Sequence, residues 1–116
     1  MIRVLVTGFG PFPGAPVNPT EMLMRRLAAD PPDLGPDVAL TVEVVATEYG
    51  GLRATLERLG REVGPDIALH FGLAASAEAI RLERVARNAV AVGRPDAAGF
   101  CPAEPHFVAG GPDHAA

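Results

Sequence analysis

The stretch VLVTGFGPFPGAPVNPTE, residues 4–21, decides the fold of this chain. Val4 to Thr7 are β-branched or apolar and stop at Gly8, which predicts a short buried strand. Residues 9–17 are rich in Gly and Pro and predict a loop. Asn18 can cap a helix, Pro19 suits its first position, and Glu21 stands where a capping-box acid stands. The stretch therefore predicts a strand, a loop and a helix in succession.

The same succession continues beyond residue 21. Leu23 and Leu27 give the first helix an apolar stripe, which residues 30–32 (Asp-Pro-Pro) end. Residues 38–47 are rich in Val and Thr and predict a second strand. A second helix follows Gly50-Gly51 with an apolar face and a Glu57–Arg61 pair, and Gly64-Pro65 ends it. Its face consists of Leu52, Leu56, Leu59 and Val63. Residues 67–71 are a third apolar run, so the alternation predicts an α/β fold with a largely parallel sheet.

The last third of the chain gives weaker patterns. Residues 79–90 fit a strand through the alternation of Ile80 and Leu82 with charged residues, and fit a helix through Leu82, Ala86 and Ala89. We favour the strand. Residues 93–116 show neither periodicity nor a cap. No internal repeat and no domain boundary is visible, so the sequence predicts one domain.

Composition excludes several classes of protein. The chain has 116 residues, a net charge of −4 and no run of basic residues, which argues against a nucleic-acid partner. One cysteine cannot form an internal disulfide, which fits a reducing cytoplasm. No stretch approaches the ~18 apolar residues of a membrane span, and the first residues lack a signal peptide. We therefore expect a soluble cytoplasmic protein without a membrane partner.

The loop after the first strand lies where a dinucleotide fingerprint would lie. A phosphate cradle presents backbone N–H groups, but Pro11 and Pro13 each remove one. Phe9 and Phe12 add two apolar rings where a dianion would sit. The loop therefore suits a flat, weakly polar ligand better than a pyrophosphate. The other interpretation, favoured on residue types alone, is that both rings close the top of the core.

Few other residues offer chemistry. Cys101 has Glu83, His106 and His114 as potential helpers, but it lies in a Gly/Pro-rich tail with no helix after it, so we expect an inert thiol. His70 ends an apolar strand and is expected to be a satisfied residue at the edge of the core. The spacing of His and Cys residues fits no metal site. We expect neither a metal nor a cofactor.

Two blocks of sequence together resemble the pyroglutamyl peptidase I family, also called pyrrolidone-carboxylate peptidases. The first is VLVTGFGPF at residues 4–12, followed by Asn18-Pro19-Thr20. The second is FGLA at 71–74 with IRLERVARN at 80–88, which is similar to the family's Glu-Arg-x-Ala-x-Asn segment. Pro95-Asp96 and Gly99 continue the likeness. The blocks follow the family's order at close to its spacing and cover essentially the whole chain.

The resemblance implies an α/β/α sandwich with a mixed, mostly parallel central sheet. It implies a cytoplasmic cysteine peptidase, without metal or cofactor, that releases N-terminal pyroglutamate from peptides. In such a Glu, Cys and His triad the thiolate attacks the amide carbonyl, His moves the proton, and Glu orients the His. By matching position, Glu83 is the triad Glu, and Phe9 and Phe12 hold the pyroglutamyl ring.

The chain also departs from the family pattern. Leu73 replaces a polar residue near the pocket, and Arg94 is displaced by one position or lost. The family's Cys and His segments lie further downstream than residue 116. We therefore expect residues 1–116 to be the N-terminal part of one such domain, inactive alone and prone to form homo-oligomers through uncovered sheet and helix surfaces. The alternatives are a non-catalytic module that binds pyroglutamyl or lactam ligands and, less favoured, a small nucleotide-binding domain.

Overall fold

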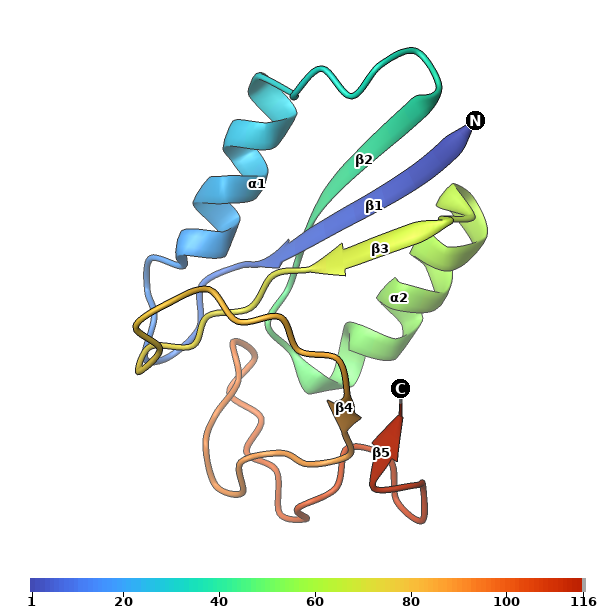
Figure 1. The fold of residues 1–116 in the computed structure, drawn as a ribbon. Helices are drawn as coiled ribbons and strands as arrows, with labels where there is room; N and C mark the ends of the chain where they lie inside the picture. Colours follow the sequence, from blue (N-terminus) through green and yellow to red (C-terminus); the bar gives the residue numbers. More distant parts are fainter. Residues whose placement is uncertain (116) are drawn as a thin grey trace.

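The computed structural model describes residues 1–115, and its centre is a three-stranded parallel sheet of order β2-β1-β3 (Figure 1). Strand β1 (Ile2–Phe9) pairs along its whole length with β2 (Val38–Val45), from Ile2 opposite Val38 to Phe9 opposite Val45. On its other side β1 pairs with β3 (Ile67–His70). The predicted α/β fold with a parallel sheet is confirmed.

Helices α1 (Pro19–Ala29) and α2 (Tyr49–Val63) cover opposite faces of the sheet. Side chains alternate along β1, so Leu5 and Phe9 point to one face while Val6 and Gly8 point to the other. Leu5 packs in a core cluster with Val45 and with Leu59 of α2. On the other face, Gly8 lies against α1. Three layers result, as the expected sandwich requires.

Gly8 explains which residues of α1 are buried. A Cβ at this position would lie 2.6 Å from the carbonyl oxygen of Thr20 and 2.7 Å from Cγ of Met24. The helix therefore approaches the sheet through Thr20 and Met24, which are buried. The predicted stripe of Leu23 and Leu27 is only half right, because Leu23 is exposed.

The ends of both helices follow the sequence signals, but two predicted side-chain pairings are wrong. Asn18 caps α1, and Gly64 ends α2 in the left-handed conformation with φ of 56°. Glu21 accepts from Arg25 at 2.8 Å instead of completing a capping box. Glu57 pairs with Arg53 at 3.1 Å rather than with Arg61.

Beyond β3 the chain is mostly irregular, and the predicted strand over 79–90 is wrong except for β4 (Ala86–Arg87). This two-residue strand pairs antiparallel with β5 (His114–Ala115). Ile80 and Leu82 are 91% and 86% exposed, so their alternation has no apolar surface to pack against. A β pattern without such a surface does not fix a strand.

Strand β3 is an open edge of the sheet. All four of its residues are exposed, and Ile67 and Leu69 lie beside Val4 and Val6 on the face that α1 covers only over the other two strands. Parallel strands are normally buried on both faces. Among the described residues, neither helix is long and apolar enough to cross a membrane.

Candidate active site

Phe9 ends β1 and Phe12 lies in the loop that follows, at the carboxyl edge of the parallel sheet, which is the usual place for sites in such sheets. The loop after β1 is fixed by the carbonyl oxygen of Gly10. It accepts from Nδ2 of Asn18 at 3.1 Å and from Oγ1 of Thr47 at 2.8 Å. The first bond ties the loop to α1, and the second ties it to the chain after β2. This backbone is therefore held rigidly from two sides.

Phe9 and Phe12 take different positions in this loop. Phe9 is half-buried and packs against the cluster of Leu5, Val45 and Leu59. Phe12 is also half-buried and lies in a tight turn, closed by reciprocal backbone hydrogen bonds with Ala15 at 2.9 and 3.2 Å. Within residues 1–115 the two rings make no aromatic pair with each other. Phe9 therefore closes the core, as the structural interpretation predicts, and Phe12 does not.

The start of α1 has few free backbone N–H groups with which to bind a phosphate. The N–H of Thr20 donates to Oδ1 of Asn18 at 3.0 Å, and that of Glu21 donates to the Asn18 carbonyl at 3.1 Å. Pro19 has no N–H. The groups that would bind an anion at a helix N-terminus are thus already used within the chain.

His70 is satisfied by its neighbour on β1. Its Nδ1 lies 2.7 Å from Oγ1 of Thr7, which is buried. The two residues are paired in the sheet register, so their side chains lie on the same face. The expectation of a hydrogen-bonded His is confirmed, although the residue as a whole is exposed.

Glu83 lies in the irregular segment between β3 and β4 and is exposed. It takes part in none of the four ion pairs found over residues 1–115, all of which involve Arg25, Arg53 or Arg58. The alternative interpretation, a charge paired with Arg81, Arg84 or Arg87, is therefore not what the structure shows. Its carboxylate is free to accept a hydrogen bond.

Cys101 and the tail histidines are not assembled into a catalytic group. Cys101 is exposed, and its Sγ lies 4.0 Å from the carbonyl oxygen of Gly99. His106 and His114 are exposed as well. The described part of the chain holds no cluster of three or more His, Cys, Asp or Glu residues that could bind a metal.

A residue that sequence reasoning missed, Asp96, organises this end of the molecule. Its buried carboxylate accepts from the backbone N–H of Tyr49, Ala98 and Phe100, each at 2.9 Å. The Tyr49 N–H is the first of α2, whose N-cap residue Glu48 makes no side-chain cap. The Tyr49 bond contributes most to holding the pKa of Asp96 below its ordinary value of 3.8, while burial opposes it. Asp96 thus caps a helix 47 residues away.

Asn88 makes a second tether between distant segments. Its Nδ2 donates to the carbonyl oxygen of Val108 at 2.7 Å, and its Oδ1 accepts from the N–H of Val108 at 2.7 Å. Both Asn88 and Asp96 belong to the sequence motifs quoted above, so the motif match is the signal that could have pointed to these two residues. A motif match marks a position but does not tell a tether from a catalytic group.

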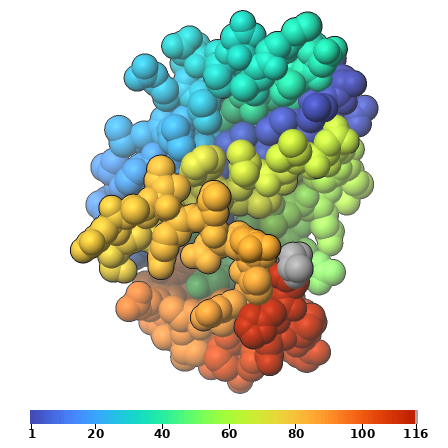
Figure 2. Space-filling view, in the orientation of Figure 1, coloured from blue at the N-terminus to red at the C-terminus, as the bar shows by residue number. Residues whose placement is uncertain are grey.

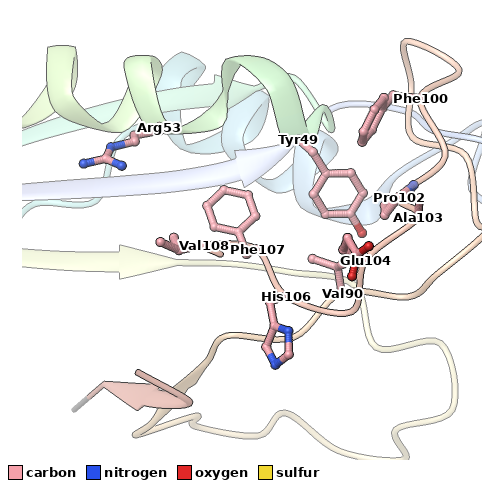
Figure 3. Close-up of a pocket in the computed structure, with 10 residues that line it drawn as sticks. All are labelled: Tyr49, Arg53, Val90, Phe100, Pro102, Ala103, Glu104, His106, Phe107 and Val108. Carbon is pink, nitrogen blue, oxygen red and sulfur yellow. The ribbon is translucent and has the colours of Figure 1, made fainter. Parts of the chain in front are cut away.

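The tethered tail leaves two adjoining cavities beside the start of α2, of about 460 and 440 Å³. They share Tyr49, Val90, Phe107 and Val108. Figure 2 shows this face of the molecule hollowed between the gold segment and the orange tail. Figure 3 shows the Tyr49 ring between those of Phe107 and Phe100 in the larger cavity. Phe9, Phe12 and Glu83 do not line either cavity.

Comparison with known proteins finds matches along nearly the whole chain. A family model described as pyroglutamyl peptidase matches residues 2–115. The pyrrolidone-carboxylate peptidase of Pyrococcus furiosus is 41% identical over 95 residues, which are 82% of this chain and 44% of that protein. That of Thermococcus onnurineus is 35% identical and is matched over 97% of this chain and 54% of its own length.

Solved structures agree with the sequence comparison. The crystal structure of the pyrrolidone carboxyl peptidase from Fervidobacterium islandicum superposes with a TM-score of 0.85 at 34% identity. The superposition covers 99% of this chain and 54% of that one. The chain thus spans about half the length of the relatives it matches.

Proposed function

Because the chain belongs to the pyroglutamyl peptidase family, we propose that residues 1–116 are the N-terminal part of one peptidase domain that releases N-terminal pyroglutamate from peptides in the cytoplasm. The family match over residues 2–115 carries this proposal. The chemistry is that of a cysteine peptidase, with a thiolate attacking the amide carbonyl and a His returning the proton to the leaving amine.

The loop after β1 is proposed to hold the pyroglutamyl ring. A lactam is flat and uncharged and presents one N–H and one C=O, so an aromatic face and a few hydrogen bonds are enough to select it. Phe12 offers a half-exposed ring on a rigid turn, and Phe9 supports the loop from the core side. The backbone N–H groups at the start of α1 are already hydrogen-bonded within the chain, which favours this neutral ligand over a nucleotide phosphate.

Glu83 is proposed to orient the catalytic His. Its exposed, unpaired carboxylate is suited to accept the ring N–H of an imidazole, which fixes the tautomer of that His. Cys101 is not proposed as the nucleophile, because neither a His nor a helix N-terminus activates its thiol. The nucleophile and base are instead assigned to the segments that follow in the family pattern.

Ligand binding and turnover test these assignments separately. Calorimetry of the 116-residue chain should detect pyroglutamyl amide and should not detect prolyl amide, which lacks the lactam carbonyl. Phe12→Ala should weaken the binding about tenfold, in the range of one lost aromatic contact. Equal binding of both amides would refute the lactam site.

Release of a chromogenic amine from a pyroglutamyl amide tests catalysis. We expect no turnover by the 116-residue chain. Turnover that disappears in Cys101→Ser would show that this thiol is the nucleophile and would overturn the assignment. Binding without turnover also fits the second candidate function, a lactam-binding module, which the half-exposed Phe12 ring together with the unactivated thiol of Cys101 favours.

A further inference from the structure

The two cavities beside α2 have the size of a ligand site, since sites for small molecules span roughly 300–1,000 Å³. The larger measures about 460 Å³ and lies between the start of α2 and the tail that Asp96 and Asn88 tether. The cavities are adjacent, because four residues line both. Together they form one hollow, here called the Tyr49 hollow.

Most of the lining of the Tyr49 hollow is apolar or aromatic, although Glu104 also lines the larger cavity and Arg87, Asn88 and His114 line the smaller one. The Tyr49 ring centroid lies 6.5 Å from that of Phe100 at an interplanar angle of 68°, and 6.3 Å from that of Phe107 at 47°. Val90, Pro102, Ala103 and Val108 add aliphatic surface to the larger cavity. Arg53, a further lining residue, is paired with Glu57, and Figure 3 shows His106 directed away from the rings. These walls suit an uncharged apolar group.

Three indirect links connect the hollow to the segments of the proposed pyroglutamyl site. Leu52 lines the smaller cavity and packs against the same core cluster as Phe9. Ala86, three residues after Glu83, lines that cavity too. A third link runs from the Gly10 carbonyl through Thr47 to the N–H of Ala97, at 2.8 and 2.9 Å, and so connects the first loop to the tail.

We propose that the Tyr49 hollow binds the apolar side chain of the residue that follows pyroglutamate in the substrate. This proposal rests on the proposed function. We place the rest of a peptide that the loop after β1 holds at its first residue along the carboxyl edge of the sheet, towards the hollow between α2 and the tail. A bulky apolar side chain in the hollow buries apolar surface against the three rings and therefore binds more tightly, whereas glycine has no side chain to bury.

The composition of the chain provides a direct probe of this hollow. Tyr49 is the only tyrosine, and there is no tryptophan, so intrinsic fluorescence reports on the hollow alone. The ligands are pyroglutamyl-phenylalanine amide, pyroglutamyl-glycine amide and N-acetyl-phenylalanine amide, with affinities measured by calorimetry. We expect the phenylalanine peptide to bind about tenfold more tightly than the glycine peptide and to change the Tyr49 fluorescence.

Variants then assign the effect to the hollow. Phe107→Ala should remove the preference for phenylalanine over glycine, and Phe107→Leu, which keeps most of the volume, should retain part of it. Phe107 is 40% exposed, so its truncation should leave the fold intact. Leu34→Ala is the matched control, because Leu34 is 47% exposed in the loop before β2 and does not line the hollow. It should leave the preference unchanged.

The outcomes separate this inference from the function on which it rests. Equal affinity for the phenylalanine and glycine peptides would overturn the role of the hollow and leave the proposed function standing. So would a preference that leaves the Tyr49 fluorescence unchanged. Failure of both pyroglutamyl peptides to bind would overturn the proposed function and the substrate assignment with it, even if N-acetyl-phenylalanine amide still changed the Tyr49 fluorescence.

Discussion

At the scale of single residues, Gly8 sets the distance between the sheet and α1. Gly8→Ala would place a Cβ 2.6 Å from a backbone oxygen and 2.7 Å from Met24, which forces the helix outward. Overpacking of this kind costs about 1–3 kcal/mol, and we expect the free energy of unfolding, measured by urea titration, to fall by that amount.

The matched control for Gly8 is Gly60 in the middle of α2, where an added Cβ would meet nothing within 4 Å. Gly60→Ala should raise the free energy of unfolding by roughly 0.5–1 kcal/mol through helix propensity. Equal effects at both positions would show that α1 does not lie as close to β1 as the structure places it.

Asp96 makes stability depend on pH. Its pKa is lower in the folded chain than in the unfolded one, so the unfolded chain binds the proton more readily. The stabilisation is therefore complete above the ordinary value of 3.8 and is lost as the pH falls through the folded pKa. Asp96→Asn should lower the Tm by several degrees at pH 7, and the difference from the unmodified chain should shrink towards pH 3.

Asp37→Asn is the control for Asp96, since it removes the same charge from an exposed position. It should leave the Tm at pH 7 nearly unchanged. If the two variants have the same pH profile, the loss belongs to net charge rather than to the three hydrogen bonds of Asp96.

The site residues show how far sequence alone reaches. The capping role of Asn18 was predictable, because its partner Thr20 is two residues away. The role of Asp96 was not, because its helix lies 47 residues away and nothing local indicates that contact. The sequence points to Phe9 and Phe12 as a pair. Because β1 extends to residue 9, the alternation of its side chains turns Phe9 into the core, whereas Phe12 lies beyond the strand.

At the scale of elements, Leu59 is the most deeply buried contact of α2 with the sheet, and Leu52 and Val63 pack around it only partly buried. Leu59 is 2% exposed and packs with Leu5 and Val45, whereas Leu56, predicted to share its face, is 39% exposed. Leu59→Ala should lower the free energy of unfolding by about 2–5 kcal/mol, and Leu56→Ala by less than about 1 kcal/mol. Similar losses in urea titrations of the two variants would contradict the packing described for α2.

The regular elements were predictable where the chain supplies both a pattern and a surface for it. Residues 4–71 do so, since each strand has a helix or a neighbouring strand within the same stretch. The pattern at Ile80 and Leu82 has no such partner, and it produced a false strand. Hydrophobic alternation shows that a segment can form a strand, but the partner decides whether it does.

At the scale of the whole molecule, the chain exposes more surface than its mass requires. Its accessible area is 8389 Å², against roughly 6,000 Å² for a folded monomer of this mass. The radius of gyration is 15.2 Å, against about 13 Å for a domain of this length. The excess is as large as the area buried in a stable protein interface.

We therefore expect the 116-residue chain to self-associate, and light scattering should give a mass that rises with concentration. Leu69, 47% exposed on the open edge strand β3, is part of this surface. Leu69→Glu should shift the mass towards the monomer, because a charge buried at an apolar contact is costly. Leu34→Glu, in a loop, should not. A monomer at every concentration, with a sharp unfolding transition, would refute this prediction.

The position of β1 in the sheet has a consequence for synthesis. Of the three strands in this sheet, the central one is made before the other two, and its Thr7 meets His70 on β3 only after 63 further residues have been added. At a translation rate of about 5–20 residues per second, this delay is roughly 3–13 s. Throughout it the nascent chain carries an apolar strand with one or both edges unpaired. The yield of folded protein should therefore depend on chaperone capacity more steeply than the final stability would suggest.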